Sequence, residues 1–164
     1  MKMKLLYIIP VFLSVIFCGI ILADEEIGLD VYLPPHHSLY SPNEKYKCVT
    51  ERSADGELKL FLYSSYKDSK TLVCSTMRTL GVAWAPNSKW MAVMNNYAAS
   101  ETSVLIFELD EKTPVLLYQT PFLKGDAYSW EVESWNTHAK TVTLKRTGKE
   151  SQRSLAEVVS LERK

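Results

Sequence analysis

Histidine and cysteine are scarce in this sequence, with three residues of each among 164. Zinc sites need three or four ligands at characteristic spacings, and no Cys or His pair has such a spacing, so we expect no metal site. The adjacent His36 and His37 would point to opposite faces of an extended strand and could not hold one ion together. The chain also lacks a glycine-rich phosphate loop, so we expect no cofactor.

An excess of charge of either sign is missing as well. Lys plus Arg and Asp plus Glu both number 19, so no global field would attract nucleic acid, and we expect none to bind. The hydrolase motifs Gly-x-Ser-x-Gly and His-Glu-x-x-His are absent. The sequence motifs therefore favour a protein that is not an enzyme.

The N-terminal segment Met1–Ala23 is typical of an export signal. Lys2 and Lys4 precede the almost continuously apolar run Leu5–Leu22, and a small residue then stands before an acidic stretch. We expect a signal peptide over 1–23 and one domain over 24–164, which places the protein in the periplasm or outside the cell. The alternative is an uncleaved anchor with the domain facing outside the cytoplasm, the only membrane contact we expect.

A sequence repeat organises the rest of the chain. Tyr40–Val49 aligns with Trp84–Val93 at a constant offset, sharing an aromatic residue, Pro-Asn, Lys, a second aromatic residue and an apolar run. Trp135–Leu144 is a fainter third copy. A period of roughly 40–50 residues is typical of propellers and solenoids. No segment after Ala23 has helical periodicity, so the sequence predicts an all-β protein.

Each repeat is predicted to form short strands. In the second unit the strands are expected at Leu80–Ala85, Trp90–Asn95, Ser103–Leu109 and Val115–Thr120. The recurring aromatic residues could form a sugar platform, but their size favours a place in the core. Cys48 and Cys74 fall on strands two and four of the first unit, too far apart for a disulfide.

The turns Ser41–Lys45 and Ala85–Lys89 resemble the Ser-Pro-Asp-Gly-Lys turn of TolB-like β-propeller repeats, with Asn in place of Asp and Glu or Ser in place of Gly. The resemblance covers His36–Leu161. It implies a small β-propeller-like body of three four-stranded antiparallel units. Leu29–Leu33 is then expected to complete the last unit and close the body as a monomer. Pairing of two chains into a six-bladed ring, a homodimer, is the alternative.

The connections between the second and third strands of each unit are expected to form one binding face. The longest is Asn95–Glu101, which resembles the Ser-containing loop of exported three-unit β-proteins that act as immunity partners of type VI secretion amidase effectors. We expect a partner-binding site at the loop tip, made of Asn96, Tyr97, Ser100 and Glu101, in which Ser100 falls at the place that the resemblance implies.

Three functional hypotheses remain open. The first is an exported non-catalytic module that binds another protein, such as an inhibitor or immunity protein acting on a peptidoglycan hydrolase. The second is a small carbohydrate-processing enzyme with paired carboxylates, and the third is a membrane-anchored envelope accessory protein. The candidate carboxylates for the second hypothesis are Asp30, Glu51, Asp55, Glu101, Asp126, Glu131 and Glu133.

Overall fold

In the computed structural model, residues 31–65, 69–98, 101–110, 113–121, 128–148 and 151–163 are described. The export segment Met1–Ala23 and the connection Phe122–Ala127 lie outside these ranges. Within the described ranges there is no helix, and so none that could cross a membrane. The all-β expectation is therefore confirmed for the described part of the chain.

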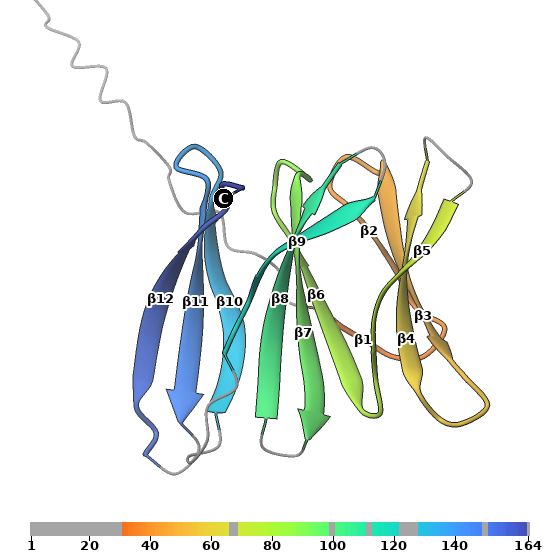
Figure 1. Ribbon diagram of the computed structural model, residues 1–164, viewed down its shortest axis with the longest axis horizontal. Helices are drawn as coiled ribbons and strands as arrows, with labels where there is room; N and C mark the ends of the chain where they lie inside the picture. The colour runs from red at the N-terminus through yellow and green to blue at the C-terminus, as the bar shows by residue number, and fades with distance from the viewer. Residues whose placement is uncertain are drawn as a thin grey trace, which may run out of the picture.

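Strands in these ranges form three antiparallel sheets (Figure 1). The strands are β1 (Val31–Leu33), β2 (Ser38–Tyr40), β3 (Tyr46–Arg52), β4 (Leu58–Ser64), β5 (Ser69–Thr76), β6 (Thr79–Trp84), β7 (Trp90–Ala98), β8 (Glu101–Leu109), β9 (Pro114–Gln119), β10 (Tyr128–Asn136), β11 (Thr141–Gly148) and β12 (Ser154–Ser160). The sheet orders are β2-β3-β4-β5, β1-β6-β7-β8-β9 and β10-β11-β12. We call them the first, central and third sheets.

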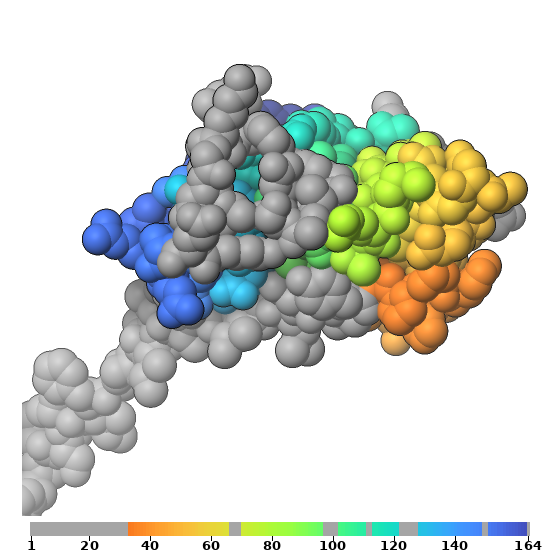
Figure 2. All heavy atoms as spheres, turned by 90° about the horizontal axis from the view of Figure 1, so that it is seen from below, coloured from red at the N-terminus to blue at the C-terminus, as the bar shows by residue number. Residues whose placement is uncertain are grey.

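The three sheets stack side by side along the longest axis of the molecule (Figures 1 and 2). One apolar layer joins the first sheet to the central sheet, and it includes Leu60, Val93 and Phe107. The other layer joins the central sheet to the third and includes Ile106, Trp135 and Leu144. The structure is thus a propeller-like body of three antiparallel units, as the sequence predicts.

The position of each sheet in the stack explains its hydrophobic pattern. β4 alternates buried and half-buried residues because only one of its faces packs against a neighbour. β6 is buried at five consecutive positions, since the central sheet is covered on both faces. An alternating pattern therefore marks the first sheet, and a continuous apolar run marks the central one.

The repeat turns share one backbone conformation in the first two units. Glu44 and Ser88 both have a φ of 58°, in the left-handed region where glycine is favoured. The turns also touch, because the backbone N–H of Asn43 donates to Ser88 Oγ at 3.1 Å. In the third unit, Lys140 has the positive φ, 53°, at the last residue of the turn. This difference agrees with the weaker third sequence copy.

The predicted role of Leu29–Leu33 is wrong where the structure describes it. Val31–Leu33 forms β1, which pairs antiparallel with β6 of the central sheet and not with the third sheet. β6 is the first strand of its unit, and β1 covers the backbone edge that β6 would otherwise expose. The sheets consequently contain four, five and three strands instead of four each. The described strands leave the stack open at both ends.

The two cysteines are not bridged, as predicted. Cys48 lies on β3 and Cys74 on β5, with β4 between them, and both thiols are free. Burial raises the pKa of Cys48 above its usual range and that of Cys74 to about 12. Both therefore stay protonated at neutral pH.

Candidate functional site

A charged hollow lies between the central and third sheets, at the edge where β7 begins and β8 ends. We call it the end pocket; its volume is about 450 Å³. It is lined by Asn87, Lys89, Trp90, Glu108, Thr137, Lys140, Leu161, Glu162 and Arg163. These residues come from one stretch that joins the β6–β7 turn to the start of β7, from the end of β8, from the β10–β11 turn and from the segment after β12. Four separate stretches of chain therefore meet there.

The charges around the end pocket are held by ion pairs. Arg163 Nε donates to Glu108 Oε2 at 2.5 Å, and Arg163 Nη2 lies 3.6 Å from Asp110 Oδ2. The hydrogen bond to Glu108 and the two carboxylate charges raise the pKa of Arg163. Lys140 Nζ lies 3.4 Å from Glu162 Oε1. The pocket thus brings carboxylates and cations together in fixed pairs.

Trp90 forms the buried side of the end pocket. Only 5% of its surface is exposed, and its Nε1–H has no hydrogen-bond partner among the described residues. The indole N–H groups of Trp84 and Trp135 are also buried, and they too have no hydrogen-bond partner among the described residues. Of these three residues, Trp90 alone lines the pocket. An unpaired buried donor costs about 1–3 kcal/mol.

A second hollow, of about 520 Å³, adjoins the first between β9 and β12. The Tyr118 hydroxyl donates to Glu157 Oε1 across it at 2.6 Å. Desolvation first, and then the bond to Glu157, raise the pKa of Tyr118 to about 12. Tyr118 is therefore a hydrogen-bond donor at neutral pH and not a base. Glu162 and Arg163 line both hollows, so the two form one continuous charged region.

Asparagine side chains shape the two turns that border the end pocket. Asn87 Oδ1 accepts the backbone N–H of Lys89 at 2.9 Å, and Asn136 Oδ1 accepts that of Ala139 at 2.8 Å. Such local bonds are the reason why Asn is common in tight turns. The lysine that recurs in the repeat, Lys89 or Lys140, is thereby placed at the rim of the pocket. That recurrence is the sequence signal that could have indicated this end.

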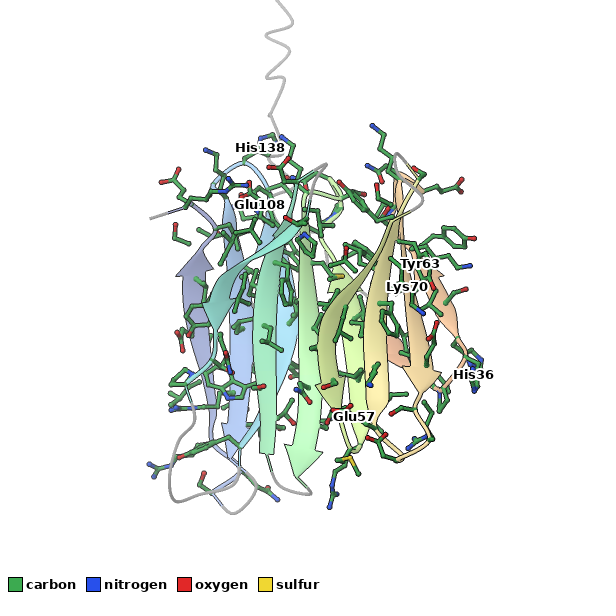
Figure 3. The ribbon with its side chains drawn as sticks, turned by 45° about the vertical axis from the view of Figure 1, so that its right-hand side comes forward. His36, Glu57, Tyr63, Lys70, Glu108 and His138 are labelled. Atoms are coloured by element: carbon green, nitrogen blue, oxygen red, sulfur yellow. The ribbon has the colours of Figure 1, made fainter. Side chains whose placement is uncertain are left out.

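The residues predicted to bind a partner lie at the opposite ends of the strands from the end pocket. Glu57, which ends one of the expected binding loops, is far from Glu108 in Figure 3. Asn96 and Tyr97 are not in a loop, because β7 continues to Ala98 and β8 resumes at Glu101. Ser100 lies outside the described residues. No observation tests this binding site, which stays a prediction.

The Asn96 side chain serves the hairpin itself. Its Nδ2 donates to Thr79 at 2.8 Å, and its Oδ1 accepts from Thr102 at 2.6 Å. These bonds join β7 to both neighbouring strands. Part of the longest predicted loop is thus paired strand, because Asn95, Asn96 and Ala98 extend the ladder, with a register shift at Tyr97.

The carboxylates predicted as catalytic pairs have other partners. Glu51 lies 2.7 Å from Lys70, Glu131 lies 3.1 Å from Lys145, and Asp55 accepts a hydrogen bond from Ser53. Asp30 and Asp126 are outside the described residues. The carboxylates that do line the end pocket, Glu108 and Glu162, were missed because they are far apart along the chain. Among the described residues, no cluster of His, Cys, Asp and Glu could hold a metal ion.

Comparison with known proteins gives a likeness in fold. No family model and no curated protein matches the chain. The chain is similar to the crystal structure of a protein provisionally named 6-phosphogluconolactonase from Bacteroides uniformis ATCC 8492, with 12% identity, 77% of this chain and 41% of that chain covered, and a TM-score of 0.41. A protein of the same provisional name from Bacteroides fragilis NCTC 9343 has 10% identity, covers 79% and 40%, and has a TM-score of 0.39.

The comparison corrects the first functional hypothesis. The sequence favoured a non-catalytic inhibitor or immunity protein, whereas both of these structures carry the name of an enzyme, and neither is described as an immunity protein or as TolB-like. The non-catalytic interpretation is not retained. The chain spans about two fifths of the length of these structures. At such low identity no activity or residue role is transferred from them.

Proposed function

We propose that this protein is a carbohydrate-processing hydrolase whose substrate binds in the end pocket. The observation that carries the proposal is the meeting of Glu108, Glu162 and three cations around one hollow. Among the described residues, Lys89 is the lining cation without an ion pair, since Lys140 pairs with Glu162 and Arg163 pairs with Glu108 and Asp110. This unpaired cation favours a substrate with a negative group, such as a sugar acid or a sugar phosphate.

Asn87 and Thr137 complete the recognition of a sugar. Their amide and hydroxyl groups line the same pocket, and both can donate and accept hydrogen bonds to sugar hydroxyls. Trp90 adds an apolar surface. Seven of the nine lining residues are polar or charged, which suits a ligand rich in hydroxyl and acidic groups.

The ion pairs favour the hydrolysis of an ester or lactone over that of a glycosidic bond. Cleavage of a glycoside needs one carboxyl group that is protonated, to donate to the leaving oxygen. Here Glu108 is paired with Arg163 and Glu162 with Lys140, so neither carboxyl group is free to be placed as that acid. An ionised carboxylate is suited to act as a general base on water, and cations are suited to stabilise an oxyanion.

Glu108 is the proposed base. It is half-buried, and Arg163 fixes its position. Water attacks the carbonyl carbon while Glu108 takes its proton, and Lys140 stabilises the negative oxygen of the tetrahedral intermediate. The carbon–oxygen bond of the ester then breaks, and the leaving oxygen takes the proton back from Glu108. The products are a sugar acid and, for a lactone, a free hydroxyl on the same molecule.

Hydrolysis of sugar lactones by the purified protein tests the proposal. The name of the two structural neighbours supplies the first compound, the lactone of 6-phosphogluconic acid, and a neutral glycoside serves as the comparison substrate. Glu108→Gln is expected to lower kcat at least about 100-fold, the usual contribution of a general base. Glu57→Gln is the matched control, because Glu57 has a side-chain exposure of 30% against 29% for Glu108 and is also ion-paired.

Glu57 lies at the opposite ends of the strands from Glu108 (Figure 3). The Glu57→Gln variant should therefore keep full activity. An equal loss of activity in both variants would show that the substitutions act by destabilising the fold and not by removing a group from the end pocket. Lactone hydrolysis that persists unchanged in Glu108→Gln would refute the assignment of the base. Cleavage of the glycoside but not of the lactone would refute the proposed reaction.

A further inference from the structure

The outer face of the first sheet is unusually apolar for a surface that no described strand covers. The strand register places Tyr40, Phe61, Tyr63 and Leu72 on this face, together with Lys47 and Lys70. Tyr40 is 54% exposed and Leu72 is 52% exposed. Tyr63 and Lys70 point outward together at this end of the stack (Figure 3). We call this the aromatic face.

Lysine side chains lie over the rings of the aromatic face. Lys70 Nζ is 3.9 Å from the centre of the Phe61 ring, and Lys47 Nζ is 5.3 Å from that of Tyr40. Lys70 also pairs with Glu51 at 2.7 Å. With Lys47 beside this pair, the centre of the face has one positive charge in excess. Such a surface attracts an acidic one.

The outer face of the third sheet has the opposite character. Its register positions on β11 and β12 are mostly Thr and Ser, and we call it the hydroxyl face. Glu131 and Glu133 are exposed on β10, and one lysine, Lys145, pairs with Glu131 at 3.1 Å. One negative charge is therefore in excess. Val158, 67% exposed, is a large apolar side chain in the middle of this face.

We propose that a second copy of this chain covers both faces, with the aromatic face of each copy packed on the hydroxyl face of the other. Two reciprocal contacts of this kind close a ring of two chains and six sheets. The charges are complementary, since the excess lysine meets the excess glutamate. The exposed Tyr40 and Leu72 would then pack against Val158 and its neighbours. Neighbouring sheets within one chain already pack in this way through their apolar side chains.

The available area is sufficient for a stable dimer. Strand spacing and rise give about 450 Å² for a four-stranded face and about 350 Å² for a three-stranded one, each about seven residues long. The smaller face limits each contact, so two contacts bury about 1,400 Å² in total, which is within the range of a specific interface. Pairing of two aromatic faces would instead bring like charges together. A single contact without closure would leave one face open and produce filaments.

Sedimentation velocity of the protein purified from cells expressing the full chain tests the proposal. The unchanged protein is expected to sediment as a dimer. Leu72→Glu on the aromatic face and Val158→Glu on the hydroxyl face should each yield monomers. Met77→Glu is the matched control, because Met77 is 64% exposed but lies in the connection between β5 and β6, and it should leave the dimer intact.

Circular dichroism of each variant confirms that the sheets are retained, so that loss of the dimer is not loss of the fold. A mixture of the two monomeric variants retains one intact contact and should partly recover the dimer. A monomer at all concentrations would overturn the proposal. A dimer that survives Val158→Glu would show that the aromatic faces pair with each other, and open polymers would refute closure of the ring.

Discussion

Replacing Glu44 by glycine tests the turn that defines the repeat. Glu44 is exposed and has a φ of 58°, a conformation that costs about 1–2 kcal/mol for a residue with a Cβ atom. Glycine removes this cost, but its freedom in the unfolded chain takes back about 0.4–1 kcal/mol. We expect Glu44→Gly to raise the free energy of unfolding by about 0.5–1 kcal/mol, and the Tm by about 2–4 °C.

Ser88→Gly is the matched comparison, since Ser88 has the same φ in the second unit. Its hydroxyl is buried and accepts the backbone N–H of Asn43, a bond with a net contribution of about 0.5–1.5 kcal/mol. The two effects nearly cancel, so this variant should have a Tm close to that of the unchanged protein. Urea unfolding gives both free energies. A Glu44→Gly variant no more stable than the original would refute the left-handed turn.

Three further predictions concern the core and the titrating groups. Ile106→Ala should lower the free energy of unfolding by about 2–5 kcal/mol and Ile106→Val by about 0.5–1.5, measured in urea, because Ile106 is fully buried between two sheets. Cys48 and Cys74 should react with a thiol reagent at pH 8 only after denaturation, since the raised pKa of each thiol leaves almost no thiolate. The pKa of Tyr118 is higher in the folded than in the unfolded protein, so its stabilising effect should be lost as pH rises from about 10 to about 12. Tyr118→Phe should reduce this loss, and equal alkaline unfolding of both proteins would contradict it.

The fold was largely predictable from the sequence because its signals are local. The strands of the second unit lie within a few residues of their expected positions, since apolar alternation and the Pro-Asn turns determine them. The partner of Val31–Leu33 was not predictable in this way. Its pairing with β6 depends on which edge the stacked sheets leave uncovered, and a short apolar strand fits several edges equally well.

The end pocket was harder to predict than the fold. Glu108 ends a central strand, Lys140 closes a turn of the third sheet, and Arg163 follows the last strand. Only the stacking of two sheets brings these three residues together. Counting carboxylates along the chain selected Glu51 and Glu131 instead, which form ion pairs on the outer faces. The spacing of residues along the sequence does not show which residues far apart in the chain come close together in the fold.

Binding of an anionic sugar at the end pocket is tested most directly by NMR of the indole N–H groups. The probe is 6-phosphogluconate, titrated into the full chain labelled with nitrogen-15. The Nε1–H resonance of Trp90, which lines the pocket, should shift and saturate, while that of Trp84 should stay in place because Trp84 is buried in the other apolar layer. The absence of any saturable shift of Trp90, or an equal shift of Trp84, would contradict the account.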